Sequence, residues 1–146
     1  MDLTTQYLGL TLRNPVVASA GPLSQTVAGV RELAAGGVGA TVMYSLFEEQ
    51  VRRELLRDAE LEQAHDESFA EALSYFPAVA TPTERGVADT YVDLVRRAAA
   101  AVDVPVIASI NGASLGGWVE IAQQLADAGA SAIELNIYFV PGNLTM

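Results

Sequence analysis

The sequence predicts an α/β fold organised around a parallel β-sheet. Short apolar runs that end in small residues alternate with stretches of helical periodicity, which is the pattern of βαβ units. One such unit occurs twice, because residues 14–21, NPVVASAG, return as VPVIASING at 104–112. The apolar residues, 51% of the 146, are spread evenly along the chain, which indicates a single globular domain over residues 1–146.

The first elements are a hairpin and a strand. Residues 3–14, LTTQYLGLTLRN, alternate apolar and polar side chains around Gly9, which predicts a small β-hairpin. Residues 15–21, PVVASAG, form a short apolar run between a proline and a glycine. Such a run is typical of a strand buried on both faces, so we expect the first parallel strand here.

A helix and a second strand complete the first copy of the repeat. Residues 22–37 place valines and leucines at helical spacing, with Ser24 as the expected N-cap and Gly36-Gly37 as the expected end. Residues 40–47, ATVMYSLF, are again apolar and predict a strand. A strand, a helix and a strand within about thirty residues predict a parallel pair.

Two further helices are expected between the copies, over residues 48–67 and 85–102, separated by a less regular stretch. The second copy then follows as a strand at 104–112, a helix at 118–129 and a strand at 131–139. Its helix places one apolar face toward the sheet through Trp118, Ile121, Ala122 and Leu125. The alignment of the copies sets Gly37 on Gly129 and Ala40 on Ala132.

Four parallel strands at this spacing suit either a doubly wound sheet or part of an eight-stranded barrel. No G-x-G-x-x-G motif follows the first strand, which weakens the dinucleotide-binding alternative. A repeat of two βα units favours a barrel, in which odd and even strands contribute alternate layers of the interior.

The composition excludes several functions. A formal net charge of −10 disfavours nucleic acid as a partner, since that binding requires clustered basic side chains. All eight basic residues are arginines, so a lysine Schiff base is excluded within this chain. The only histidine, His65, lies among scattered carboxylates, and we expect no metal site. The absence of cysteine, of a basic leader and of any apolar run of 18 residues predicts a cytoplasmic protein without a membrane partner.

The strand ends carry the candidate site, because function in parallel barrels and sheets gathers at the carboxyl ends of the strands. Small and neutral-polar side chains there suit a flat heterocycle better than a metal or a phosphoryl group. The strand-end residues are Ser19, Ala20 and Gly21; Tyr44 and Ser45; Ser109, Ile110, Asn111 and Gly112; and Asn136, Ile137 and Tyr138.

Asn136 stands out because it interrupts an apolar run, where a buried amide must find partners in a ligand or in the protein. Glu134 shares its face and needs a partner as well, for which an arginine ion pair or a catalytic role are the two readings. The glycine-containing loop 111–117 opens a helix and is a weak candidate for anion binding, since no lysine accompanies it.

Three motifs, taken in order, resemble the first half of the dihydroorotate dehydrogenase family, whose members are FMN-dependent (β/α)₈ TIM barrels. Residues 8–22, LGLTLRNPVVASAGP, are similar to that family's N-terminal hairpin and first strand. Residues 39–50, GATVMYSLFEEQ, are similar to its second strand, and 129–143, GASAIELNIYFVPGN, to its fourth, usually E-L-N-x-S-x-P-N. The resemblance implies an α/β half-barrel: the first four strands of a TIM barrel behind an N-terminal hairpin.

The resemblance also implies roles for individual residues. It places Ser19, Ala20 and Gly21 beside the isoalloxazine ring of FMN, and Ser45 and Asn136 in hydrogen bonds with flavin or substrate. Asn111, at the third strand end, completes the candidate cofactor-binding residues.

The departures from the family concern charge and proton transfer. Tyr44 stands where the family has a lysine, and Phe139 stands near the position of its catalytic cysteine or serine. The base is therefore unknown, with Tyr44 and Tyr138 as weak candidates. The Asn- and Gly-rich substrate loop is not recognisable in residues 67–79.

The implied function is an FMN-dependent oxidoreductase that transfers hydride between flavin and a small, pyrimidine-like substrate, as in pyrimidine biosynthesis. Because the family's second half is missing after Met146, we expect this chain to be inactive alone. Either it is a fragment of a longer protein, or two copies pair into a homodimer through their half-barrel edges. The alternative is a non-catalytic, self-associating half-barrel. A barrel aldolase or lyase is disfavoured by the missing lysine.

Overall fold

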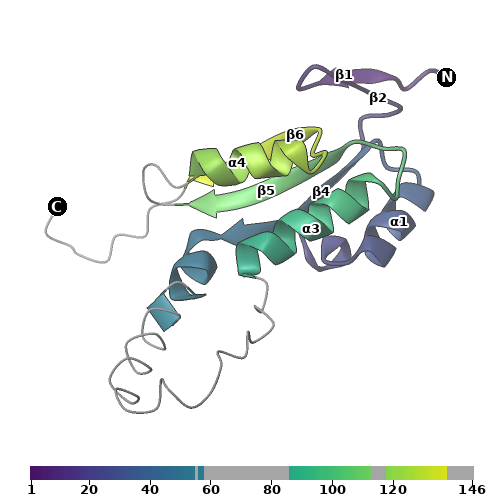
Figure 1. The fold of residues 1–146 in the computed structure, drawn as a ribbon. Helices are drawn as coiled ribbons and strands as arrows, with labels where there is room; N and C mark the ends of the chain where they lie inside the picture. The colour runs from purple at the N-terminus through teal and green to yellow at the C-terminus, as the bar shows by residue number, and fades with distance from the viewer. Residues whose placement is uncertain (55, 58–85, 113–117, 138–146) are drawn as a thin grey trace, which may run out of the picture.

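The computed structural model of the chain describes residues 1–54, 56–57, 86–112 and 118–137. After an N-terminal hairpin, the strands of the main sheet are separated along the chain by helices (Figure 1). The elements are β1 (Thr5–Tyr7), β2 (Leu10–Leu12), β3 (Val17–Ala18), the 3₁₀ helix η1 (Pro22–Ser24), α1 (Val27–Ala35), β4 (Ala40–Phe47), α3 (Val87–Ala99), β5 (Val106–Gly112), α4 (Trp118–Asp127) and β6 (Ala132–Ile137).

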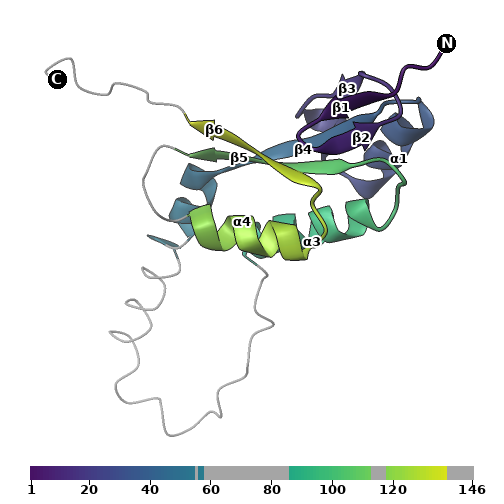
Figure 2. The same ribbon diagram turned by 90° about the horizontal axis from the view of Figure 1, so that it is seen from above.

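A four-stranded parallel sheet in the order β3-β4-β5-β6 is the centre of the structure. Right-handed crossovers between strands in sequential order place every connecting helix on the same face. Figure 2 shows α1, α3 and α4 along one face of the sheet, which we call the helix face. A doubly wound sheet would have a non-sequential order and helices on both faces. The predicted parallel half-barrel is thereby confirmed, and the described strands do not close into a full barrel.

The hairpin is confirmed. β1 and β2 pair antiparallel through a two-residue turn in which Leu8 and Gly9 have φ angles of 53° and 76°. Positive φ at both central residues is the mark of a type I′ turn, whose twist matches that of the flanking strands. The hairpin lies across the sheet from the helices (Figure 2), and Leu12 packs there on Ala40, Val42 and Ile107. We call this second face the inner face, because it corresponds to the interior of a barrel.

Most of the core lies between the sheet and its helices. It includes side chains from α1, α3 and α4 that meet the outward-pointing residues of β4 and β5. Its buried members are Val30, Met43, Leu46, Tyr91, Val92, Val95, Ala98, Val106, Ala108, Ile110, Leu125 and Ala128. Trp118 and Ile121 pack against it, which confirms the apolar face predicted for the helix at 118–129.

The first strand differs from expectation. β3 has two residues, both half-buried, and the preceding Val16 is 60% exposed, so the prediction of a strand buried on both faces is wrong. The reason is its position at the edge of the sheet, where it has β4 on one side and no strand on the other. An apolar run bounded by proline and glycine cannot distinguish an edge strand from a central one.

The helix after it begins two residues later than predicted. Ser24 is not the N-cap: it lies in η1, where its hydroxyl donates to the carbonyl oxygen of Gly21 at 3.0 Å. Thr26 caps α1 instead, and its Oγ1 accepts from the Gly29 N–H at 3.1 Å. Serine and threonine both favour the N-cap position. Ser24, however, belongs to the separate short 3₁₀ helix that begins at Pro22.

The glycines confirm the internal repeat. Gly37, after α1, and Gly129, after α4, have φ angles of +95° and +96°, in the left-handed region that side chains disfavour. Each reverses the chain between a helix and the next strand, and Ala40 and Ala132 begin those strands. The two copies therefore share backbone conformation as well as sequence.

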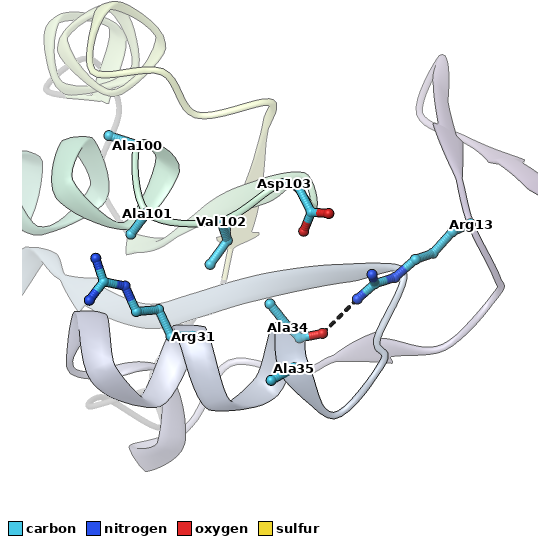
Figure 3. A pocket seen from close by; sticks show the side chains of 8 residues that line it. All are labelled: Arg13, Arg31, Ala34, Ala35, Ala100, Ala101, Val102 and Asp103. Carbon is cyan, nitrogen blue, oxygen red and sulfur yellow. Dashed lines mark hydrogen bonds between the residues drawn. The ribbon is translucent and has the colours of Figure 1, made fainter.

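Arg13 ties the hairpin to the end of α1. Its Nη2 donates to the carbonyl oxygen of Ala34 at 2.7 Å and its Nε to that of Val38 at 2.8 Å. Figure 3 shows the guanidinium reaching this helix end along a groove of about 620 Å³. A cation is favourable at the negative end of the helix dipole. This groove lies at the amino ends of the strands, away from the predicted site.

The remaining predicted helices are confirmed where the structure describes them. Residues 48–54 are helical, and α3 lies within the predicted 85–102. The rest of 48–67, including His65, lies outside the described residues. Among the residues that are described, no helix has the length and apolar character needed to cross a membrane.

Candidate functional site

The inner face changes from apolar to polar toward the carboxyl ends of the strands. Because side chains on a strand alternate between faces, every second residue of β5 and β6 points to this side, and β4 follows the same alternation before and after one irregularity between Val42 and Ser45. In-register neighbours form three successive rows across the sheet. These rows are Val42, Ile107 and Ala132; then Ser45, Ser109 and Glu134; then Phe47, Asn111 and Asn136.

Four side chains of the second and third rows bond to one another, and we call Ser45, Ser109, Glu134 and Asn136 the polar cluster. Ser109 is its centre and is fully buried. Its hydroxyl donates to Glu134 Oε1 at 2.7 Å and lies 2.8 Å from the hydroxyl of Ser45. Asn136 Nδ2 donates to the same Glu134 oxygen at 3.0 Å and lies 3.4 Å from Ser109 Oγ.

A β-bulge in β4 brings Ser45 into this cluster. Val42 pairs with Ile107 and Ser45 with Ser109, so β4 advances three residues while β5 advances two. The extra residue interrupts the ladder, as bulges do. Without it, Tyr44 would stand opposite Ser109, and Ser45 would point to the helix face instead of into the cluster.

Tyr91 satisfies the backbone beside the bulge. This buried α3 side chain sends its hydroxyl to Ser109, where it accepts from the backbone N–H at 2.9 Å and donates to the carbonyl oxygen at 3.0 Å. Burial of the ring raises the pKa of Tyr91 far above its usual value, so the hydroxyl keeps the proton that it donates. A helix side chain thus bonds to both backbone groups of Ser109, the residue at the centre of the polar cluster.

The structure brings together part of the predicted site. Ser45 and Asn136 are both in the polar cluster, and Asn111 lies in register beside Asn136. Glu134 bonds to Ser109 and Asn136, and no arginine among the described residues forms an ion pair with it.

Ser19, Ala20 and Gly21 follow the short edge strand and lie apart from the cluster in register. Ala18, the last residue of β3, pairs with Thr41, four residues before Ser45. Ala20 packs with the apolar part of the inner face. A side chain added at Gly21 would meet nothing closer than the Ser19 carbonyl oxygen at 4.0 Å, so the backbone there is open to close approach.

Tyr44 points to the opposite side of the sheet from the cluster. Its ring packs edge-on against Tyr91, with centroids 5.1 Å apart and planes at 88°, within the helix-face core. Burial raises the pKa of Tyr44, which disfavours loss of its proton. Tyr44 and Ser45 are therefore neighbours in sequence that lie on opposite faces of the sheet. The other candidate, Tyr138, lies outside the described residues, as do Phe139 and loop residues 113–117.

Among the described residues, two buried polar atoms at the end of β5 have no hydrogen-bond partner. They are Asn111 Oδ1 and Trp118 Nε1. A side chain at Gly112 would meet the indole nitrogen at 2.3 Å, so a glycine is required where the tryptophan lies on the strand. Unpartnered buried polar atoms are rare in folded proteins and mark places where a ligand or water completes the bonding.

Sequence reasoning missed Ser109 as the centre of the site and Tyr91 altogether. A signal for Ser109 was present, because the repeat aligns it with Ser19, which was a candidate. Tyr91 carried no such signal, since a tyrosine on an amphipathic helix is ordinarily core.

The arrangement can bind a neutral, flat, polar-edged ligand by hydrogen bonds. It offers hydroxyl and amide groups, one carboxylate and no cation among its described members. Within the described part of the chain, no group of three or more His, Cys, Asp or Glu side chains is arranged to hold a metal ion.

The sequence was compared with protein family models and with curated proteins. No protein family model matches the chain. A curated protein of Aeropyrum pernix named "Putative dihydroorotate dehydrogenase A (fumarate)" is 32% identical over 148 residues, which cover 99% of this chain and 45% of that relative. The chain thus spans a little under half the length of the relative that it matches. The similarity to that relative extends over nearly the whole length of this chain and agrees with the resemblance inferred from its strand ends.

Proposed function

We propose that the chain forms the ring-binding part of an FMN-dependent oxidoreductase that resembles dihydroorotate dehydrogenase. The observation that carries this proposal is the polar cluster on the inner face at the carboxyl ends of β4, β5 and β6. This is the end of a parallel barrel where active sites lie. The relationship to the Aeropyrum pernix protein supports the same assignment.

The residues present fit a flavin ring. Asn111 Oδ1 is a buried acceptor without a partner, and the open backbone at Gly21 leaves room for a flat ligand to approach. Ser45, Asn111 and Asn136 would hold the ring edge, with Ser19 and Ala20 beside it. Bound FMN would supply the hydride chemistry.

The chain's own residues would orient the ring and limit its contact with water. The apolar row of Val42, Ile107 and Ala132 lies next to the polar cluster, and Leu12 of the hairpin packs on Val42 and Ile107, so water is excluded from that side of the cluster. The substrate in this proposal is small and pyrimidine-like, with a place in pyrimidine biosynthesis. A cytoplasmic site of action suits a sequence without cysteine.

Flavin titration tests the proposal. FMN is added to the chain, and to the chain joined to the remaining part of the Aeropyrum pernix relative, and bound flavin is followed by its visible absorbance and fluorescence. We expect the joined protein to bind FMN. Asn136→Leu should weaken binding by roughly tenfold, the value of about one hydrogen bond. Gln123→Leu, on the exposed side of α4, is the control and should leave binding unchanged. A folded joined protein that stays colourless would refute the proposal.

A second candidate is a self-associating half-barrel without catalysis, and the free edge of the sheet favours it. β6 is paired on one side, and its Leu135 and Ile137 are 50% and 80% exposed. Unpaired edges with exposed apolar side chains promote association. Sedimentation velocity should then show a homodimer that Ile137→Lys converts to monomer. A cooperative, monomeric wild type would exclude this candidate.

A further inference from the structure

We infer that Glu134 is a positioning residue that fixes the direction of every hydrogen bond in the polar cluster, so that the site presents acceptors to its ligand. The ligand edge that complements such a site carries ring N–H donors, as in a lactam or an imide. The inference about the ligand rests on the proposed function, because it assumes that a ring binds here. The orientation of the protein groups is independent of the proposed function.

The carboxylate determines how the Asn136 amide is turned. A carboxylate has only acceptors, so the atom of Asn136 that lies 3.0 Å from Glu134 Oε1 must be the NH₂ nitrogen. The oxygen and nitrogen of an amide are often interchangeable in assignment, but here the network decides between them. Asn136 Oδ1 is therefore turned away from Glu134, and because the residue is exposed this oxygen is left as an acceptor for a ligand.

The same carboxylate determines the direction of the serine pair. The Ser109 hydroxyl has one proton, and the 2.7 Å bond to Glu134 uses it. In the 2.8 Å contact between the two hydroxyls, Ser45 must then be the donor and Ser109 the acceptor. Ser45 thus directs its own proton inward, and only its lone pairs are left for a ligand.

Asn111 supplies a further acceptor by an independent observation. Its Oδ1 is buried without a partner, and the residue lies in register beside Asn136 on the same face. Ligand-facing groups on three neighbouring strands thus have the same hydrogen-bonding character. Anionic groups such as carboxylates or phosphates would meet acceptors and the Glu134 charge, whereas neutral N–H donors would satisfy all three.

The orientation is tested on the free chain by NMR of ¹⁵N-labelled protein. In the wild type, the Asn136 side-chain NH₂ should exchange slowly and show a downfield proton from its charge-assisted bond. Glu134→Gln keeps the size of the side chain but can both donate and accept. It should shift this proton upfield and speed its exchange by about tenfold, the value of one hydrogen bond. Glu120→Gln, the same change in the first turn of α4, is the control and should alter neither. An Asn136 NH₂ signal that Glu134→Gln leaves unchanged would overturn the inference.

The ligand preference is tested with a matched pair of probes. Uracil carries two ring N–H donors, and 1,3-dimethyluracil carries none. The chain joined to the remaining part of the Aeropyrum pernix relative should bind uracil at least about tenfold more tightly than 1,3-dimethyluracil, and Glu134→Gln in that joined protein should reduce this ratio severalfold. Equal binding of the two probes by the unsubstituted joined protein would overturn the ligand preference. Binding of neither probe, together with the predicted NMR result, would refute the proposed function and leave the orientation established.

Discussion

The structure predicts that one hydroxyl on α3 stabilises the whole fold, and Tyr91→Phe removes only that atom. The tyrosine is fully buried, and its Oη bonds to both the N–H and the carbonyl oxygen of Ser109, at 2.9 and 3.0 Å. The phenylalanine ring fills nearly the same space, so the change leaves packing intact. It leaves two buried backbone groups without partners.

The expected loss follows from those two groups. An unpaired buried backbone donor or acceptor costs about 1–3 kcal/mol, and the carbonyl, with its second lone pair, is the cheaper of the two. The variant should therefore lose about 3 kcal/mol of unfolding free energy. For a chain of this length that corresponds to a decrease in Tm of roughly 6–12 °C.

Urea denaturation followed by far-ultraviolet circular dichroism measures the loss. The midpoint should decrease while the m-value stays constant, because the surface exposed on unfolding does not change. Tyr7→Phe is the control: Tyr7 is 49% exposed on the hairpin, and its variant should change stability by less than about 0.5 kcal/mol. If both variants lose the same small amount of unfolding free energy, the stabilising role given to the Tyr91 hydroxyl is refuted.

Three further predictions concern the same fold. The raised pKa values of Tyr44 and Tyr91 mean that the folded state holds these protons above pH 10 while the unfolded state releases them. From neutral pH to about pH 10 these two tyrosines should leave the unfolding free energy unchanged, and above it they should decrease it by up to about 1.4 kcal/mol per pH unit per tyrosine. Tyr91→Phe should reduce this slope, and an unchanged slope would count against the role given to Tyr91. Gly37→Ala and Gly129→Ala, at φ +95° and +96°, should each cost about 1–2 kcal/mol in a thermal melt, and a neutral result at either would show that its left-handed conformation is not required. Arg13→Ala removes two bonds to the end of α1 and should cost about 1–2 kcal/mol in urea, whereas the exposed Arg31→Ala should cost under about 0.5; equal losses would contradict the role given to Arg13.

The architecture could be predicted from the sequence because it rests on periodicity and repetition. The apolar runs that became β4, β5 and β6 lie where the pattern placed them, and the glycine pair at 37 and 129 marked equivalent turns. The burial of β3 could not be predicted, because an edge strand and a central strand of the same composition differ only in their neighbours. Similarly, Ser24 and Thr26 are both capable N-caps, and the position of Pro22 decided between them.

The site could be predicted only as far as strand ends reveal it. Ser45 and Asn136 follow from the rule that parallel strands gather their carboxyl ends. The side of the sheet on which Tyr44 and Ser45 lie depends on the bulge between Val42 and Ser45, and no local signal in the sequence marks that bulge. The partner of Glu134 likewise depends on register between β5 and β6, which is a tertiary property.

Chemical-shift mapping of FMN on the ¹⁵N-labelled protein tests most directly whether the inner face is the binding face. Perturbations are expected at Ser45, Ser109, Asn111 and Asn136, whereas Tyr44 and the Arg13 groove should be unaffected. Perturbations confined to the helix face, or to the groove at the amino ends of the strands, would contradict this expectation.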